Sequence, residues 1–281
     1  MKKLIFPLIG ALIIVALAIA YTGCKKDKQD KDTKAAENNA TAENAFNDVF
    51  KQVDNAAKES VMSGAKITQL DSGGCAQVTI TPYDSINWPK TMTIDFGSSN
   101  CLCNDGKYRK GKIIAILSGK YRTAGTVITV TLDQYYVNDN HVQGTKTITN
   151  LGRIGTYNGG NNLKYSVVVT NASITTPDGT ISWNSTRTRE WIAGESTPTI
   201  LLDDVYMITG SANGTDVNGN TFTVTITSAL RVAFSCRWIE SGTLDITPQG
   251  LATRTVDFGS GSCDNQATVT INGYTFNIIM G

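Results

Sequence analysis

Histidine is almost absent from this chain of 281 residues, in which His141 is the only one. A zinc site built on two histidines is therefore excluded, and a Ser-His-Asp triad would have a single candidate for its base. His141 follows the turn-like sequence Asn138-Asp139-Asn140, and the chain contains no Gly-x-Ser-x-Gly motif. We interpret His141 as an exposed hairpin residue, and the sequence does not support acyl transfer.

Paired metal-binding cysteines are also missing. The six cysteines include no Cys-x-x-Cys pair, so a thiolate metal site is not indicated and no cofactor is expected. Glutamate is scarce after residue 64, where only Glu190, Glu195 and Glu240 occur. A glycoside hydrolase needs two facing carboxyl groups, and no pair is singled out by its spacing. We therefore expect a protein that is not an enzyme, with a polysaccharide hydrolase as an alternative.

The first residues have the three parts of an export signal. Positive charge comes first (Lys2-Lys3), residues 4–20 form an uncharged apolar run, and small residues lead to a cysteine. This arrangement is typical of a cleaved signal peptide, here residues 1–23. Thr22-Gly23-Cys24 resembles the lipobox of bacterial lipoproteins, which implies that Cys24 carries a lipid anchor. The alternative is an ordinary secretory signal with an incidental cysteine.

Charge of one sign does not dominate the chain. It carries 25 lysines and arginines against 24 aspartates and glutamates, and loss of the signal peptide removes two lysines. A nearly neutral protein gives no electrostatic argument for nucleic acid as a partner. The partner that the sequence indicates is the lipid bilayer, reached through lipidated Cys24.

The composition then divides the mature chain into three segments. Residues 24–41 are rich in charge and lack large apolar residues, so we expect a flexible tether. Residues 42–63 repeat Phe46, Val49 and Val53 at helical spacing and predict an amphipathic helix, either docked on the rest of the protein or available to a partner. Residues 64–281 form the third segment.

That third segment predicts an all-β domain. Its apolar residues alternate with threonine, as in Phe222, Val224 and Ile226, which is typical of strands with one solvated face. Asn-Gly and Asp-Gly pairs such as Asn272-Gly273 separate the runs and favour tight hairpins. We expect an antiparallel meander of roughly ten to twelve strands. A two-sheet sandwich is the favoured arrangement, with a curved half-barrel as the alternative.

Two stretches of this domain are nearly the same. Residues 91–103 and 253–265 each contain Thr-x-Thr, Asp-Phe-Gly and a following cysteine, with Ile-Thr-Pro and another cysteine upstream. We interpret them as a duplicated strand–turn–cysteine unit in which Asp ends a strand, Phe enters the core and Gly turns the chain. Export favours disulfides, and the spacing pairs Cys236 with Cys263 and Cys75 with Cys101 or Cys103. A calcium site at the two aspartates is an alternative, although the spacing is not that of an EF-hand.

One stretch suggests a ligand surface. If residues 180–191 form an unbroken strand, four side chains that stack on rings and bind anions share one face: Trp183, Arg187, Arg189 and Trp191. The basic segment 107–112 could extend that face. The alternative is that the tryptophans belong to the core and the arginines lie across them.

Several sequence blocks resemble the exported lipoproteins of Bacteroidetes: Asp48-Val49-Phe50, Asp95-Phe96-Gly97, residues 109–114, 135–138 and 144–147, and the Trp183–Trp191 stretch. The resemblance implies a lipid anchor in the outer membrane, with the leaflet left open, and it supplies no catalytic residues. Asp84-Ser85-Ile86 also resembles the O-glycosylation triplet of that lineage, which implies a sugar on Ser85.

Three classes of function follow from these expectations. The first is a non-enzymatic envelope lipoprotein that binds a glycan or an envelope protein, or that has a structural role. The second is a carrier that holds an apolar ligand in a half-barrel, which would require an open concave face lined by apolar residues. The third is the polysaccharide hydrolase, which would require two carboxyl groups within about 10 Å in a cleft.

Overall fold

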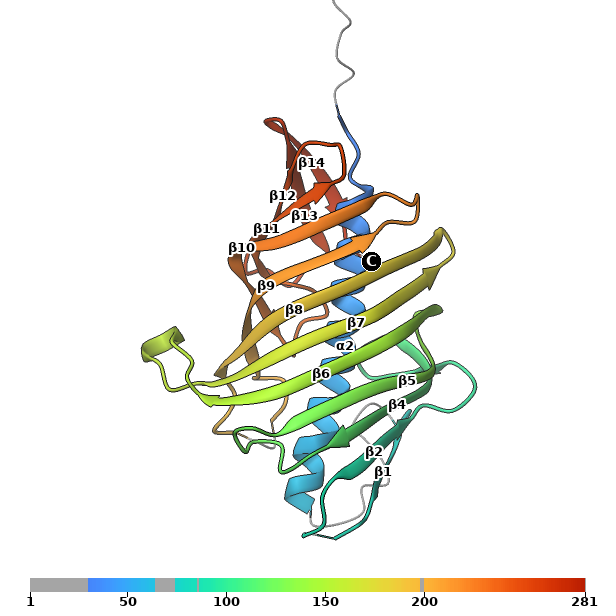
Figure 1. The fold of residues 1–281 in the computed structure, drawn as a ribbon, viewed down its shortest axis with the longest axis vertical. Helices are drawn as coiled ribbons and strands as arrows, with labels where there is room; N and C mark the ends of the chain where they lie inside the picture. Colours follow the sequence, from blue (N-terminus) through green and yellow to red (C-terminus); the bar gives the residue numbers. More distant parts are fainter. Residues whose placement is uncertain (1–29, 64–73, 85, 198–199, 281) are drawn as a thin grey trace, which may run out of the picture. The chain divides into compact units, whose positions relative to one another are not determined.

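A computed structural model of the chain describes residues 30–63, 74–84, 86–197 and 200–280. From Asp32 onwards the chain forms one compact unit, and the following concerns that unit alone (Figure 1). It contains helix α2 (Lys34–Ser63), a short 3-10 turn η1 (Tyr157–Gly159) and fourteen strands. The strands are β1 (Gln77–Thr81), β2 (Lys90–Asp95), β3 (Cys101–Leu102), β4 (Tyr108–Leu117), β5 (Val127–Val137), β6 (Asn140–Arg153), β7 (Leu163–Thr176), β8 (Gly179–Ala193), β9 (Val205–Thr215), β10 (Thr221–Ala233), β11 (Ser241–Pro248), β12 (Arg254–Ser260), β13 (Gln266–Ile271) and β14 (Tyr274–Ile279).

All of these strands belong to one antiparallel sheet. Apart from β3, which pairs only with β4, each strand lies beside its neighbours in the sequence, in the order β1-β2-β4 and so on to β14. The all-β class and the meander are therefore confirmed, with fourteen strands instead of ten to twelve. The two-sheet sandwich is wrong, because the sheet is single and open, as in the half-barrel alternative.

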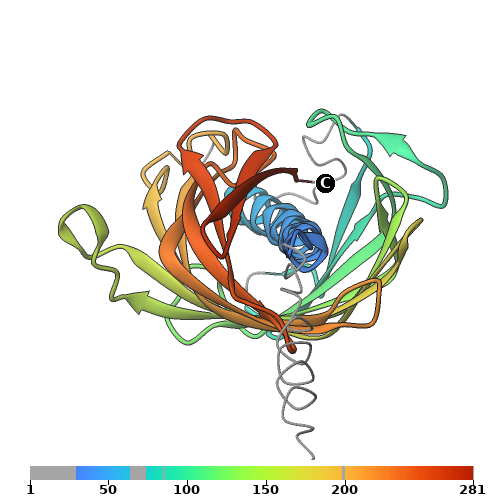
Figure 2. The ribbon, with the colours of Figure 1, turned by 90° about the horizontal axis from the view of Figure 1, so that it is seen from above.

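The sheet curves into a long trough, and helix α2 lies inside it (Figures 1 and 2). Register shifts interrupt the pairing of most of the long strands, and such bulges bend a strand and increase its twist. The apolar side chains of the concave face must be buried against another element. Helix α2 fills this role, as a second sheet does in a sandwich.

Helix α2 is longer and more deeply buried than the sequence indicates. It begins at Lys34, so the predicted tether boundary at residue 41 is wrong, and none of residues 34–57 is exposed. Alanines in its first turns, among them Ala35, Ala36 and Ala40, are almost fully buried. A run of alanines shows no apolar periodicity from which a helix could be predicted. Their small side chains let the backbone of α2 lie close to the strands. The docked-helix interpretation is confirmed.

Alternation along the strands divides the sheet into an inner face towards α2 and an outer face towards solvent. In β10, Phe222 and Val224 are buried, while Thr221, Thr223 and Thr225 are exposed. The hairpin predicted at Asn272-Gly273 joins β13 to β14, and both residues have the positive φ that such a turn requires (50° and 83°).

The duplicated unit is confirmed in its hairpins, but the two strand ends differ: β2 ends at Asp95, as predicted, whereas β12 continues past Asp257 to Ser260. Ile80 of the first Ile-Thr-Pro faces Met92 in the β1–β2 pair, and Ile246 of the second faces Arg254 in the β11–β12 pair. In both copies the Asp-Phe-Gly begins three residues after the second partner, Met92 or Arg254. Phe96 and Phe258 are each 3% exposed, and both glycines have positive φ. The disulfides are Cys75–Cys101 and Cys236–Cys263, with Cα atoms 5.6 Å apart in both. The choice left open between Cys101 and Cys103 therefore falls on Cys101.

Candidate functional site

The four side chains of the predicted ligand face do share one face of strand β8, as expected. Helix α2 covers that face. Trp183, Arg187, Arg189 and Trp191 all point into the trough and are at most 3% exposed. Trp183 Nε1 donates to Asn39 Oδ1 at 3.0 Å, and Arg187 Nη2 lies 2.7 Å from Glu43 Oε2. The interpretation as a surface for external ligands is thus wrong, and the alternative of a structural core is confirmed.

Arginines of this face lie over aromatic rings, as that alternative predicts. The guanidinium of Arg187 is 5.8 Å from the ring centre of Trp183, and that of Arg189 is 4.2 Å from the ring of Phe50 on the helix. Arg189 also donates to Asn47. Burial lowers the pKa of Arg189 to about 10, against the raising influence of nearby acidic groups. These contacts bind the helix to the wall of the trough.

The basic segment 107–112 does not extend a ligand face either, because its charged side chains lie on opposite faces of the sheet. Arg109 is fully buried and its guanidinium contacts the carboxylates of both Asp48 and Asp105. Lys107 Nζ lies 3.1 Å from Asp48 Oδ1. Lys112, on the outer face, pairs with Asp95 at 2.9 Å. The segment is divided between a buried ion network and an exposed ion pair.

Asp48 and Asp105 converge on Arg109, so they have the proximity that a hydrolase requires. Burial alone would raise the pKa of each carboxyl, but the charge and hydrogen bonds of Arg109 outweigh it and lower both pKa values. An acid catalyst of glycoside hydrolysis needs the opposite, a raised pKa that keeps its proton near neutral pH. This carboxyl pair therefore lacks the raised pKa of such a catalyst, and its contacts with Arg109 join α2 to β4.

Within the described residues, the concave face that a carrier would need to keep open is filled by helix α2. Helix α2 occupies it along its length, and its large side chains Phe46, Phe50 and Val53 are at most 2% exposed. Among the described cavities, the one beside the helix at Ala57, Met92 and Tyr121 has a volume of about 30 Å³, which is room for a single water molecule.

The remaining sequence predictions have mixed outcomes. His141 is half-buried at the start of β6 and stacks on Tyr136, with ring centres 4.5 Å apart. Cys103 is a buried free thiol, and burial raises its pKa.

Cys24 and Ser85 lie outside the described residues, so the lipid anchor and the sugar stay predictions. The described part of the chain contains no acidic, cysteine and histidine cluster that could hold a metal ion, and no helix in it is long and apolar enough to cross a membrane.

A larger hollow lies on the outer face, where the sequence predicted no site. This outer groove has a volume of about 500 Å³, within the range of ligand sites, and lies over β8–β11 beside the β11–β12 turn. None of the side chains that line it is charged. Those with hydroxyl or amide groups are Ser182, Asn184, Asn213, Thr215, Thr221, Thr223, Thr247 and Gln249.

The polar groups of the outer groove are only partly used by the protein itself. Thr221 donates to Gln249 at 2.8 Å, and Asn184 accepts from the backbone N–H of Asn171 at 2.8 Å. Within the described residues, the hydroxyls of Ser182, Thr215 and Thr223 have no protein hydrogen-bond partner. Each such hydroxyl can both donate and accept. At the rim, Leu251 is 42% exposed and provides an apolar contact.

Sequence reasoning missed this groove because its residues are common in strands. Threonine and asparagine at alternate positions indicate a solvated face, and nothing in one strand distinguishes a groove from any other part of that face. The groove depends on four strands and on the 248–251 turn at their edge. Comparison with protein-family models, with curated proteins and with solved structures finds no match to this chain.

Proposed function

We propose that this protein is a lipid-anchored lipoprotein of the cell envelope, held in the outer membrane through Cys24, whose β domain binds an uncharged glycan in the outer groove without catalysing a reaction. The observation that carries the glycan proposal is the chemistry of the groove. It has many hydroxyl and amide groups, an apolar rim residue and no charged side chain. Sugar hydroxyls donate and accept in the same way as these groups do.

Two observations support binding instead of catalysis. The groove lining contains no carboxylate, histidine or lysine to serve as an acid or base. Its serine and threonines therefore have no neighbour in the groove that could activate them as nucleophiles. The carboxyl pair that does converge, Asp48 with Asp105, is bound in ion pairs by Arg109 and Lys107.

Replacing groove residues tests the proposal. We expect Asn213→Ala and Thr223→Val each to weaken glycan binding about threefold to tenfold, since each removes one hydrogen-bonding group worth about 1 kcal/mol. Binding of the full chain to immobilised mannan, xyloglucan and dextran is the measurement. Both side chains are exposed, so the unfolding midpoint should not change.

The matched control is Thr268→Val, the same change on the outer face of β13, outside the groove. It should leave binding unchanged. If the parent protein binds none of the three polysaccharides, or if the control loses as much affinity as the groove variants, the groove is not a glycan site.

The anchor is tested separately from the groove. We expect Cys24→Ala to move the protein from the membrane fraction to the soluble fraction of lysed cells, because the variant cannot be lipidated. Intact-mass measurement of the parent protein should show the added acyl chains. An unmodified mass, or a variant that stays in the membrane fraction, would support the incidental-cysteine alternative.

A further inference from the structure

The outer groove continues into a row of hydroxyl side chains that crosses the whole sheet. Following the register from β1 to β14, each strand on the path contributes one outer-face residue that lies directly opposite its neighbours. The thirteen residues are Thr81, Thr91, Ile116, Thr129, Thr147, Val168, Thr186, Ser211, Thr225, Asp245, Thr255, Thr270 and Thr275. Ten of them carry a hydroxyl group, and none of them is buried. We call this set the hydroxyl row.

The hydroxyl row adjoins the groove. Three residues that line the groove, Asn184, Asn213 and Thr223, face one another across β8, β9 and β10. In each of these strands the row residue (Thr186, Ser211 or Thr225) is two positions away from the groove residue. Residues two apart in a strand lie on the same face, about 7 Å from each other. Row and groove are therefore parts of one continuous surface.

The row carries little charge, although threonine itself is common on solvated strand faces. A solvated strand face accepts lysine and glutamate, yet the only charged member of the row is Asp245, and it accepts a hydrogen bond from Thr255 at 2.7 Å. The two aliphatic members, Ile116 and Val168, offer contacts for the CH groups of sugar rings. A surface with one carboxylate and no cationic side chain does not favour an anionic polymer or nucleic acid, both of which need cationic partners.

The row is also long. Strands in a sheet are about 4.8 Å apart, so thirteen strands place its ends roughly 58 Å from each other. The sheet curves around α2 along the strand direction, so the row runs with the long axis of the trough, on its convex side (Figures 1 and 2). A convex, elongated surface is open to a long chain at both ends, whereas a short ligand would use only the groove.

From this geometry we infer that the glycan is an extended, uncharged polysaccharide that lies across the strands, with one segment in the outer groove and the remainder along the hydroxyl row. This inference rests on the proposed function and names the class of ligand. Each additional sugar that reaches the row adds weak contacts to an already bound chain, so affinity rises with chain length.

The test compares chain lengths and removes the distant half of the row. Affinities of the full-length protein are measured for mannan, xyloglucan and dextran and for oligosaccharides prepared from each, with hyaluronan as the anionic comparison. We expect the best polymer to bind about tenfold or more tightly than its trisaccharide. The triple variant Thr91→Val, Thr129→Val and Thr147→Val should lose most of this gain, about tenfold, and keep the trisaccharide affinity. Valine keeps the branched shape that strands favour, so the fold is retained.

The matched control triple is Thr149→Val, Thr188→Val and Thr209→Val, in the next row on the side away from the groove. It should keep the polymer affinity. Equal binding of trisaccharide and polymer, or equal losses in the two triples, would overturn the extended-chain inference and leave the glycan-binding groove intact. Preference for hyaluronan, or no binding to any of the glycans, would overturn both.

Discussion

Replacing Asp48 by alanine is expected to lower the free energy of unfolding by about 3–5 kcal/mol, the usual result of removing one partner of a buried ion pair. The side chain of Asp48 is 1% exposed and that of Arg109 is fully buried. Asp48 accepts from Arg109 Nε at 3.0 Å, from Lys107 at 3.1 Å and from the Tyr135 hydroxyl at 2.9 Å. In the variant Arg109 keeps Asp105 as an acceptor. The buried Tyr135 hydroxyl and the partly buried Lys107 both lose Asp48. Urea unfolding of the full chain gives the difference.

The same carboxylate makes stability depend on pH in a defined direction. The pKa of Asp48 is held far below its ordinary value, so its contribution is complete above about pH 5 and is lost as the pH falls below the ordinary aspartate pKa of about 3.9. The pKa of Asp105 is lowered as well and adds a change of the same sign. The parent protein should therefore lose stability between about pH 5 and pH 3, and Asp48→Ala should lose less over that interval.

A matched control is Asp95→Ala, which removes the carboxylate of an ion pair whose two side chains are 36% and 43% exposed. Such surface pairs contribute little, and we expect a change below about 1 kcal/mol. Similar losses for Asp48→Ala and Asp95→Ala would show that the network does not hold the helix in the trough.

The Asp48 network also shows which features the sequence could predict. Local signals were sufficient for the strands: the alternation of Phe222 with Thr223 predicts a half-buried strand, and Asn272-Gly273 predicts its hairpin. Each depends on neighbours within a few positions. The duplicated Asp-Phe-Gly was equally readable, because an identical spacing to a cysteine implies an identical local geometry.

Contacts between distant segments could not be predicted in this way. Trp183 and Arg187 have the same strand pattern whether water or a helix covers them, and their partners Asn39 and Glu43 lie 144 residues earlier in the chain. Nothing in the local sequence of residues 180–191 indicates whether this face is exposed to water or covered by a helix. The choice between sandwich and trough depends on the same contact, because the helix fills the concave face.

The hydroxyl row lies between these two cases. Outward-facing threonines are readable in each strand, but their alignment requires the register of twelve strand pairs, and several of those pairs contain bulges that shift it. A change of one residue in any pair would exchange the inner and outer faces. The surface that we propose for glycan binding is therefore a property of the assembled sheet.

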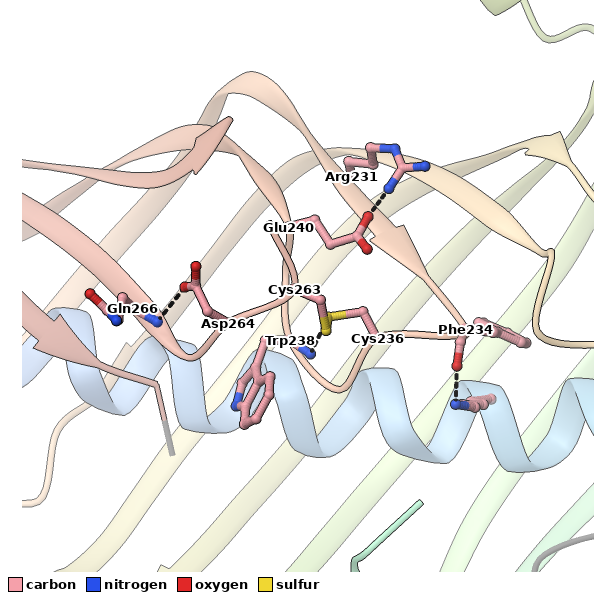
Figure 3. Close-up of a disulfide and its surroundings, with 9 residues drawn as sticks. Arg231, Phe234, Cys236, Trp238, Glu240, Cys263, Asp264 and Gln266 are labelled. Carbon is pink, nitrogen blue, oxygen red and sulfur yellow. Dashed lines mark hydrogen bonds and ion pairs between the residues drawn. A yellow bond between two sulfur atoms is a disulfide. The ribbon is translucent and has the colours of Figure 1, made fainter. Parts of the chain in front are cut away.

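Removing either disulfide is expected to cost about 3–4 kcal/mol, because each closes a loop of similar length, with partners 26 and 27 residues apart. The variants are Cys75→Ala with Cys101→Ala, and Cys236→Ala with Cys263→Ala. Figure 3 shows the second disulfide beside helix α2, next to Phe234, whose carbonyl accepts from Lys51 of the helix. Urea unfolding of the two double variants gives the comparison.

The two losses should differ by less than about 1 kcal/mol if the bridges act by restricting the unfolded chain, since their loop entropies are nearly the same. A much larger loss for the Cys236–Cys263 pair would instead indicate that this bridge positions the segment that contacts Lys51 in the folded state. Thiol exchange should not obscure the result. Cys103 is buried, and burial raises its pKa, so little of the reactive thiolate is present near neutral pH. Cys103→Ala is the control, and it should leave both disulfides intact on a non-reducing gel.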